Sequence, residues 1–525
     1  MKHKRAAPRL LSVLLSGLLC TAAACAATPE SKTVWITVGD AAYAELQKVA
    51  PQAIARESQL TQSGEAGTRF AATEKIHLVE VNEEQLLKLS SAIHHELKRC
   101  GGFMFHSSET AGRTALTAPV NKGLLAAARP AYVIDNQSLV TPVLSQMQDS
   151  NIGQTIVDLS AFANRYYTTT NGANASNWLK QKWSTMAAGR ADITVTQFAH
   201  TGYNQKSVIL TINGTDNAAE VVVLGGHLDS INGNGTGETT KAPGADDDAS
   251  GIASLTEALR SIVATGYKPR RTIKLIGYAA EEVGLRGSQD IAKNFKANNV
   301  NVVGVMQLDM TNYKGSPSDI YIYTDYTDSL QNDFLVKLIT TYLPTLSVGY
   351  DKCGYGCSDH ASWTAQGYAA SLPFETSFNQ DNPYIHTAND TYANSGNQAA
   401  HALKFARLAA AYAIELGSDG PGVVPPPDTV QTLSGSLNRG QSKTFGPYKV
   451  GAGGNFKASM TGTGDTDLYL RKSAVPTTTT SDCKSESSSS TETCSLSLAA
   501  NGDVYVLVYG YTASTYNLTV TYRPQ

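Results

Sequence analysis

Continuous apolar runs alternate with segments of helical periodicity in the middle of this chain. Three of the runs end in polar residues: EVVVLGGH (220–227), TIKLIGYAAEE (272–282) and VVGVMQLDM (302–310). Between them lie SGIASLTEALRSIVATG and GSQDIAKNFKANN, which read as helices. Unbroken apolar strands that alternate with helices are typical of a mainly parallel sheet with helices on both faces. We therefore expect residues 127–418 to form an α/β domain around a mainly parallel (mixed) sheet sandwiched by helices.

The pattern changes on both sides of this domain. Within residues 27–126, KIHLVEV alternates like a strand and EEQLLKLSSAIHHELKR has the period of an amphipathic helix, so this segment predicts a small α+β unit. Residues 419–430 read as a Pro/Gly linker. In residues 431–525, short aromatic strands such as DVYVLVYGY alternate with Gly- and Ser-rich turns, which predicts a C-terminal β-sandwich.

The chain begins with the pattern of a secretory signal peptide. The basic stretch MKHKRAAPR precedes an apolar run that is too short for a confident membrane anchor, and Ala24-Cys25-Ala26 offers a small-residue cleavage site. We therefore expect residues 1–26 to be removed and the protein to be secreted (extracellular). A lipid-modified Cys25 is the alternative, but the three alanines before it make a poor lipidation motif.

Export changes how the cysteines are interpreted. Cys353 with Cys357, and Cys483 with Cys494, form two close pairs, and an oxidising destination favours disulfides. A zinc site is the rival interpretation of the first pair. The spacing of that pair does not suit such a site, and no second pair lies nearby in the sequence.

Composition narrows the choice of partner. The chain has 525 residues, which is too long for one core and predicts two or three domains. It is 42% hydrophobic and 17% charged, with a formal net charge of -3. This balance of charges does not favour binding to nucleic acid or to an anionic membrane surface.

Imidazole and carboxylate groups follow the predicted strands at the points where the strands end. The ligand site of such a sheet lies beyond the carboxyl ends of its strands. The residues expected there are His227, Glu281, Glu282 and Asp309, joined by Asp247 in GADDDASG and His386 in NPYIHTAND. Mixed nitrogen and oxygen ligands without thiolate suit zinc or a similar divalent ion.

Charge counting favours two ions at this site. Three ligand carboxylates against two dications leave a charge of +1, which one bridging hydroxide neutralises. A further carboxylate outside the ligand set is then available as a general base. Each motif alone has an ordinary explanation, because three aspartates at a helix start also serve as caps and adjacent glutamates are usually solvated. Their joint position at the strand ends is what favours a metal centre.

Several motifs closely resemble those of the secreted bacterial dizinc leucyl aminopeptidases of peptidase family M28. The motifs are GGHLDS, APGADDDASG, YAAEEVGLRGSQD, QLDMTNYKG, CGYGCSDHASW and NPYIHT, and the resemblance extends from about Tyr166 to about Gly417. It implies two Zn²⁺ ions per chain, one held by His227 and Asp309, the other by Glu282 and His386, with Asp247 bridging both.

The resemblance also implies roles for the neighbouring carboxylates. Glu281 corresponds to the general base, and Asp229 corresponds to a carboxylate that orients the imidazole of His227. Asp248 corresponds to a residue that helps to fix an unusual backbone turn. Asp246 is then expected only to cap the helix or to face solvent.

The same resemblance implies which residues contact the substrate. A disulfide between Cys353 and Cys357 closes a loop that carries Tyr355, which is expected to help hold the tetrahedral intermediate; a purely structural aromatic is the alternative. The residues that flank the motifs and are expected to line an apolar pocket, or equally to belong to the core, are Met310, Phe374, Phe378 and Ile385.

The flanking segments match the precursor plan of the family more loosely. Residues 27–126 resemble an N-terminal propeptide that assists folding or blocks a site, with a permanent N-terminal domain as the alternative. Residues 431–525 resemble the bacterial pre-peptidase C-terminal domain, with GDTDLYL as the best match.

We therefore predict a secreted, monomeric, zinc-dependent aminopeptidase that removes leucine or another large apolar residue from peptide and protein N-termini by means of a bridging hydroxide. A carboxypeptidase would need an arginine cluster, and Arg286 is the only arginine within the motifs. A glutaminyl cyclase usually holds a single zinc ion. A metal-free binding protein would lack ligands or the base, and none is missing in this sequence.

Overall fold

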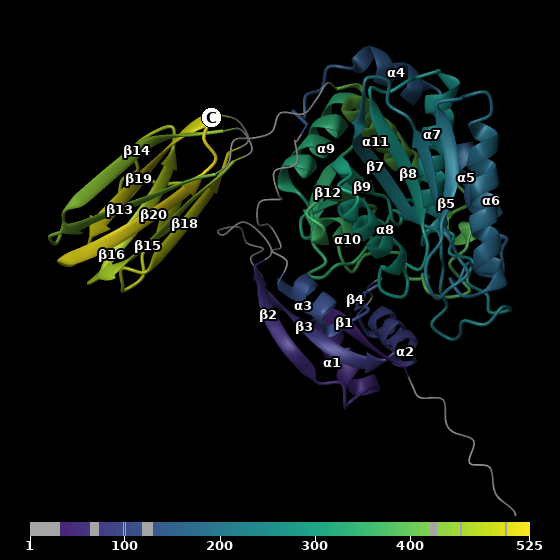
Figure 1. The fold of residues 1–525 in the computed structure, drawn as a ribbon, viewed down its shortest axis with the longest axis horizontal. Coiled ribbons are helices and arrows are strands. Elements are labelled where there is room, and N and C mark those ends of the chain that lie inside the picture. The colour runs from purple at the N-terminus through teal and green to yellow at the C-terminus, as the bar shows by residue number, and fades with distance from the viewer. Residues whose placement is uncertain are drawn as a thin grey trace, which may run out of the picture.

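The computed structural model describes residues 32–62, 73–97, 99, 101–117, 130–419, 428–451, 454–498 and 501–525. The predicted signal peptide and most of the predicted linker lie outside these residues. Figure 1 shows the described parts as an N-terminal unit, a large α/β domain and a C-terminal domain made of strands. Within the described residues, no helix is long and apolar enough to cross a membrane.

The large domain is built on an eight-stranded mixed sheet with the order β11-β10-β12-β9-β7-β8-β6-β5. The pairs β7–β8, β7–β9, β9–β12 and β10–β11 are parallel, and β5–β6, β6–β8 and β10–β12 are antiparallel. The strands are β5 Ile193–Phe198, β6 Ser207–Ile212, β7 Asn217–His227, β8 Arg271–Tyr278, β9 Asn301–Gln307, β10 Ile320–Tyr323, β11 Val348–Asp351 and β12 Ala370–Phe374. This sheet confirms the predicted fold class.

Helices cover both faces of the sheet because its central strands are apolar on both sides. In β7, Val222 and Leu224 face the larger core cluster, whereas Val221 and Val223 face a second cluster. The larger cluster includes residues of α7 and α11, and the second includes residues of α8 and α10. The helices are α4 Gln137–Ser145, α5 Asp149–Ser160, α6 Thr170–Met186, α7 Ala249–Ala264, α8 Arg286–Ala297, α9 Ser329–Tyr342, α10 His360–Ala365 and α11 Ala400–Ser418, with a 3-10 helix at Tyr392–Ser395.

The N-terminal unit is a four-stranded sheet of order β2-β3-β1-β4 with helices, as the α+β pattern predicts. Its own core contains Ile36, Leu46 and Leu89. The elements are β1 Thr33–Gly39, α1 Asp40–Val49, β2 Ala55–Gln62, β3 Thr73–Asn82, α2 Gln85–Ala92, a π-helical turn at Ile93–Leu97, β4 Phe103–His106 and α3 Glu109–Thr117.

The C-terminal domain is a sandwich of two four-stranded antiparallel sheets, which confirms the predicted architecture. Their orders are β13-β20-β15-β18 and β14-β19-β16-β17. A disulfide between Cys483 in β17 and Cys494 in β18 links the two sheets. The strands are β13 Thr429–Leu437, β14 Ser442–Val450, β15 Asn455–Thr463, β16 Thr466–Lys472, β17 Cys483–Ser485, β18 Glu492–Ser497, β19 Gly502–Gly510 and β20 Ser514–Tyr522.

Candidate metal centre

Two groups of buried imidazole and carboxylate side chains meet at the carboxyl ends of the central strands. The first group contains His227, Asp247 and Asp309, and the second contains Asp247, Glu282 and His386; one ligand atom from each member lies within 4.8 Å of the others. The structure thus brings together all five residues predicted to bind metal. Asp247 belongs to both groups, as a bridging ligand requires.

The imidazoles approach the carboxylates closely. Nε2 of His227 lies 2.8 Å from Oδ1 of Asp247 and 3.4 Å from Oδ1 of Asp309. Nε2 of His386 lies 2.9 Å from Oε2 of Glu282 and 3.2 Å from Oδ2 of Asp247. All five side chains are at most 4% exposed.

Orphaned polar atoms test whether this set fits metal ions. Four buried atoms make no hydrogen bond of acceptable geometry among the described residues, although all but Glu282 Oε1 lie within 3.4 Å of an oppositely charged group: Asp247 Oδ2, Glu282 Oε1, Asp309 Oδ1 and His386 Nε2. Such atoms are costly to bury unless they bind something, and each belongs to one of the two groups. Two imidazoles, three carboxylates and no thiolate suit zinc or a similar divalent ion. The residues therefore fit two cations.

Burial controls the proton affinity of the adjacent glutamate. Glu281 is 5% exposed. Burial, and then the negative charge of neighbouring carboxylates such as Asp309, raise the pKa of Glu281 well above its ordinary value, although the charge of His227 opposes the shift. Glu281 is thus a buried carboxylate next to the second ligand group that belongs to neither group.

Two further aspartates hold the backbone of the ligand-bearing segments. The carboxylate of Asp229 accepts hydrogen bonds from the amides of Glu281 (2.9 Å) and Glu282 (3.1 Å), and its Oδ1 lies 3.5 Å from Nδ1 of His227. The carboxylate of Asp248 accepts from the amides of His227 (2.9 Å) and Met310 (3.0 Å), and it caps α7. The peptide bond between Asp247 and Asp248 is cis. Both aspartates therefore connect segments that carry different ligands.

Asp246 differs from the sequence-based expectation. It is 0% exposed rather than facing solvent. Its carboxylate accepts a hydrogen bond from the amide of Asn312 (3.0 Å) and another from the side chain of Asn382 (3.0 Å). The expectation was wrong because helix-start aspartates are usually solvated, whereas these later loops fold over this one.

Two other residues, which no sequence motif indicates, shape the same loop. Arg165 is 0% exposed and donates to the carbonyl oxygens of Leu228 (2.8 Å) and Gly244 (2.8 Å). Asp390 accepts from the amide of Asp247 (3.1 Å). A buried arginine and a loop aspartate carry no periodic signal, so only the tertiary structure reveals them.

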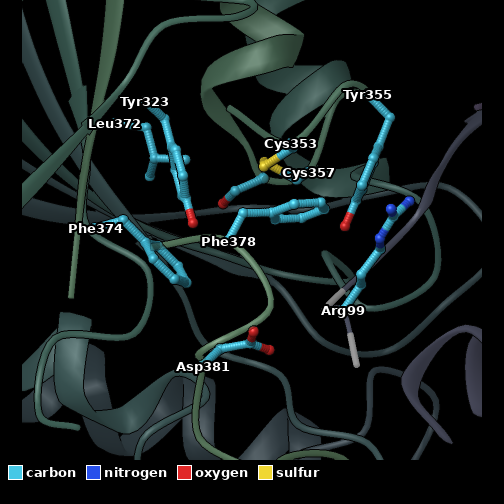
Figure 2. A pocket seen from close by; sticks show the side chains of 10 residues that line it. Arg99, Tyr323, Cys353, Tyr355, Cys357, Leu372, Phe374, Phe378 and Asp381 are labelled. Atoms are coloured by element: carbon cyan, nitrogen blue, oxygen red, sulfur yellow. A yellow bond between two sulfur atoms is a disulfide. The ribbon is translucent and has the colours of Figure 1, made fainter. Parts of the chain in front are cut away.

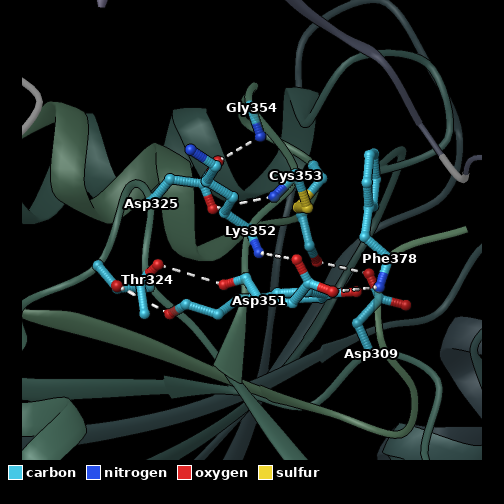
Figure 3. Close-up of a disulfide and its surroundings, with 12 residues drawn as sticks. Asp309, Thr324, Asp325, Asp351, Lys352, Cys353, Gly354 and Phe378 are labelled. Atoms are coloured by element: carbon cyan, nitrogen blue, oxygen red, sulfur yellow. Dashed lines mark hydrogen bonds between the residues drawn. A yellow bond between two sulfur atoms is a disulfide. The ribbon is translucent and has the colours of Figure 1, made fainter. Parts of the chain in front are cut away.

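The predicted disulfide loop borders a pocket (Figure 2). Cys353 and Cys357 are bonded, and the carboxylate of Asp325 accepts from the amides of Cys353 (3.1 Å) and Gly354 (2.5 Å), as Figure 3 shows. Tyr355, which is 3% exposed, lines the pocket on this loop. The remaining lining residues are Arg99, Tyr323, Ser358, Leu372, Phe374, Phe378 and Asp381.

The four predicted pocket residues divide into two kinds. Phe374 and Phe378 line the pocket. Met310 and Ile385 are 0% exposed in the same apolar cluster and do not belong to the pocket's lining. The pocket also contains Asp381, a carboxylate that the sequence analysis did not single out.

The N-terminal unit lies directly on this region. The ring of His94 lies 5.1 Å from that of His386, and the guanidinium carbon of Arg99 lies 4.6 Å from the ring centroid of Phe378. The amide of Phe105 donates to the carbonyl of Gly284 at 3.0 Å, in the segment that follows Glu282. These contacts cover both the ligand groups and the pocket.

Comparison with known proteins gives consistent matches. Residues 207–412 match the family model "Peptidase family M28", and residues 449–510 match "Bacterial pre-peptidase C-terminal domain". A probable aminopeptidase of Saccharomyces cerevisiae is 30% identical over 362 residues, which cover 66% of this chain and 93% of the relative. Leucine aminopeptidase 1 of Arthroderma gypseum is 34% identical over 311 residues, which cover 55% of this chain and 81% of the relative.

Solved structures agree with these matches. The LapA aminopeptidase of Legionella pneumophila has a TM-score of 0.60 at 31% identity, and the match covers 74% of this chain and 100% of that one. LapB of the same organism also has a TM-score of 0.60, at 29% identity and with the same coverage.

Proposed function

The chain belongs to peptidase family M28 and is a hydrolase that acts on peptide bonds, and from this premise we propose that it is a secreted, zinc-dependent aminopeptidase. The observation that carries the proposal is the pair of buried ligand groups that share Asp247. The leucine aminopeptidases among the relatives support leucine, or another large apolar residue, as the N-terminal residue removed.

The two ligand groups support a proposal for the metal-holding residues. His227 and Asp309 would hold one zinc ion, Glu282 and His386 the other, and Asp247 both. When bound, two such ions polarise a substrate carbonyl and make a water molecule more acidic. Asp229 and Asp248 keep the backbone of the ligand segments in position through the hydrogen bonds described above.

Glu281 performs the proton transfers in this proposal. Its carboxylate accepts a proton from the attacking water and then returns the proton to the leaving amine. Its place supports this role, because Glu281 is buried next to the proposed ligand Glu282 and belongs to neither ligand group. Tyr355, which lines the neighbouring pocket, would donate a hydrogen bond to the oxygen that gains negative charge.

The pocket would bind the first side chain of the substrate. Phe374 and Phe378 provide apolar walls, and the disulfide loop closes another side. A carboxypeptidase is less well supported, because it would need an arginine cluster for the substrate carboxylate, and Arg286 is the only arginine within the motifs.

We further propose that residues 27–126 are a propeptide, that residues 127–418 form the peptidase domain, and that residues 431–525 form a separate C-terminal domain. The contacts of His94 and Arg99 with the site support an N-terminal unit that blocks the substrate in the precursor. The enzyme would then be a zymogen.

The assay that tests the proposal uses the secreted, processed protein and leucine p-nitroanilide. We expect hydrolysis that is lost on chelation and restored when zinc is returned. Absence of cleavage by protein that contains zinc would contradict the aminopeptidase proposal and favour a carboxypeptidase or a cyclase.

A further inference from the structure

The pocket beside the ligand groups contains one carboxylate among mostly apolar walls. Asp381 lines it together with Leu372, Phe374 and Phe378. Burial raises the pKa of Asp381 to about 7. Among the described residues, no lysine or arginine forms an ion pair with this carboxylate. The positive charge of His386 opposes this rise, whereas the negative charges of Asp247 and Asp246 add to it. A cation that enters the pocket beside Asp381 would therefore stabilise its ionised carboxylate.

The structure also shows a basic side chain in contact with this pocket. Arg99 of the N-terminal unit belongs to the pocket's lining, and its guanidinium carbon lies 4.6 Å from the ring centroid of Phe378 (Figure 2). This geometry is a cation–π contact. Nε of Arg99 is buried and has no hydrogen-bond partner among the described residues. The aromatic wall therefore accommodates a guanidinium group in this very region.

From these two observations we propose that the pocket accepts arginine and lysine as N-terminal residues, with Asp381 as the counter-ion and Phe378 as the stacking surface. The inference rests on the proposed aminopeptidase function and extends its substrates from large apolar to basic residues. The long apolar stem of either side chain would lie along Phe374 and Leu372, and the charged end would reach the carboxylate. In the precursor, Arg99 would take part of the space that such a substrate needs.

The test compares three p-nitroanilides on the processed, zinc-loaded protein: leucine, arginine and citrulline. Citrulline has nearly the shape of arginine but no charge, so the ratio of the two kcat/KM values isolates the effect of the cation. We expect arginine to exceed citrulline by about tenfold or more, since a charge pair in a partly desolvated pocket contributes at least that much.

Two variants assign the effect to residues. Asp381→Asn keeps the shape of the side chain and removes its charge, so the arginine-to-citrulline ratio should fall to about one. Phe378→Leu keeps an apolar wall and removes the aromatic face, so the same ratio should fall by a smaller factor of a few.

The outcomes separate this inference from the function on which it rests. Leucine hydrolysis with equal rates for arginine and citrulline in the unmodified protein would overturn the inference and leave the aminopeptidase proposal intact. An equal loss for all three substrates in Asp381→Asn would also overturn it, because the carboxylate would then serve the α-amino group or the fold. Failure to hydrolyse any of the three would contradict the proposed function itself.

Discussion

At the scale of single residues, the carboxylates around the ligand groups differ in what they hold. Asp247 faces both imidazoles, whereas both oxygens of Asp229 accept from the backbone amides of Glu281 and Glu282. Asp229 therefore holds the backbone of the proposed base and of a proposed ligand together. Its contact with His227, at 3.5 Å, is longer than either of these hydrogen bonds.

Replacing Asp229 tests this positioning role. Asp229→Asn places an amide NH₂ opposite a backbone NH group, so one of the two hydrogen bonds is lost. We expect zinc affinity to fall by about 10–100-fold, as for other residues that orient metal ligands. Competition with a chromophoric chelator measures this affinity.

The matched control is Asp216→Asn. The carboxylate of Asp216 also makes a charge-assisted contact, a 2.9 Å ion pair with Arg270. Its side chain is 57% exposed, and neither residue belongs to a predicted metal-ligand group. An exposed pair of this kind contributes little, so zinc affinity should not change. Equal affinities for the Asp229 variant and the control would remove Asp229 from the positioning role.

At the scale of elements, the strand ends predict where the candidate ligands gather. His227 is the last residue of β7, Glu281 and Glu282 follow β8, and Asp309 follows β9. Parallel pairing brings these three ends to one edge of the sheet, so periodicity and topology suffice to predict the cluster. His386 comes from a loop, so no strand end predicts its place; its imidazole made it a candidate, and the family motif assigned it to one of the two ions.

Other parts of the site could not be predicted from local patterns. Arg165 and Asp390 bind the loop that carries Asp247, from positions 82 residues before and 143 residues after Asp247. Asp381 lies in an irregular segment, and Arg99 reaches the pocket from another unit. Loop conformation depends on long-range packing, which hydrophobic periodicity does not encode.

The disulfide loop gives a prediction at this scale. In the double variant Cys353→Ser/Cys357→Ser, the loop that carries Tyr355 loses its covalent closure beside the pocket. Hydrogen bonds from this loop to Asp325 remain, so the domain should fold. We expect kcat/KM for leucine p-nitroanilide to fall by about tenfold, because small displacements of catalytic groups have large effects on rate.

The second disulfide provides the control for that variant. Cys483→Ser/Cys494→Ser removes the link between the two sheets of the C-terminal sandwich. This change should lower the melting temperature of that domain and leave leucine hydrolysis as it was. If the Cys353/Cys357 variant retains full activity, the disulfide does not position the pocket.

At the scale of the whole molecule, the N-terminal unit contacts both the ligand groups and the pocket. Glu83 of this unit forms ion pairs with Lys32 (3.0 Å) and with Arg286 (2.6 Å), which belongs to α8 of the large domain. Together with His94 over His386, this contact holds the unit on the ligand groups. Release of the unit is therefore the step that would expose the pocket.

A variant of the precursor tests this arrangement. In Glu83→Gln the ion pair with Arg286 is lost, so the unit is held less tightly. We expect the activity of the precursor on leucine p-nitroanilide to rise by about two- to fivefold, because a partly exposed ion pair contributes about that much. Glu80→Gln is the control, because it breaks an exposed 3.3 Å ion pair with Arg56 inside the unit. This variant should not raise the activity of the precursor. A precursor that is already as active as the processed enzyme would contradict the blocking role.

We propose that two metal ions bind this chain and that Glu281, rather than a ligand, moves the proton. Elemental analysis and kcat, measured on the same preparation of Glu281→Gln, test both parts of this proposal. We expect about two zinc ions per chain, as in the unmodified protein, and a kcat lowered by about a thousandfold or more, within the range for loss of a general base. A variant that retains both ions and a nearly normal kcat would contradict it.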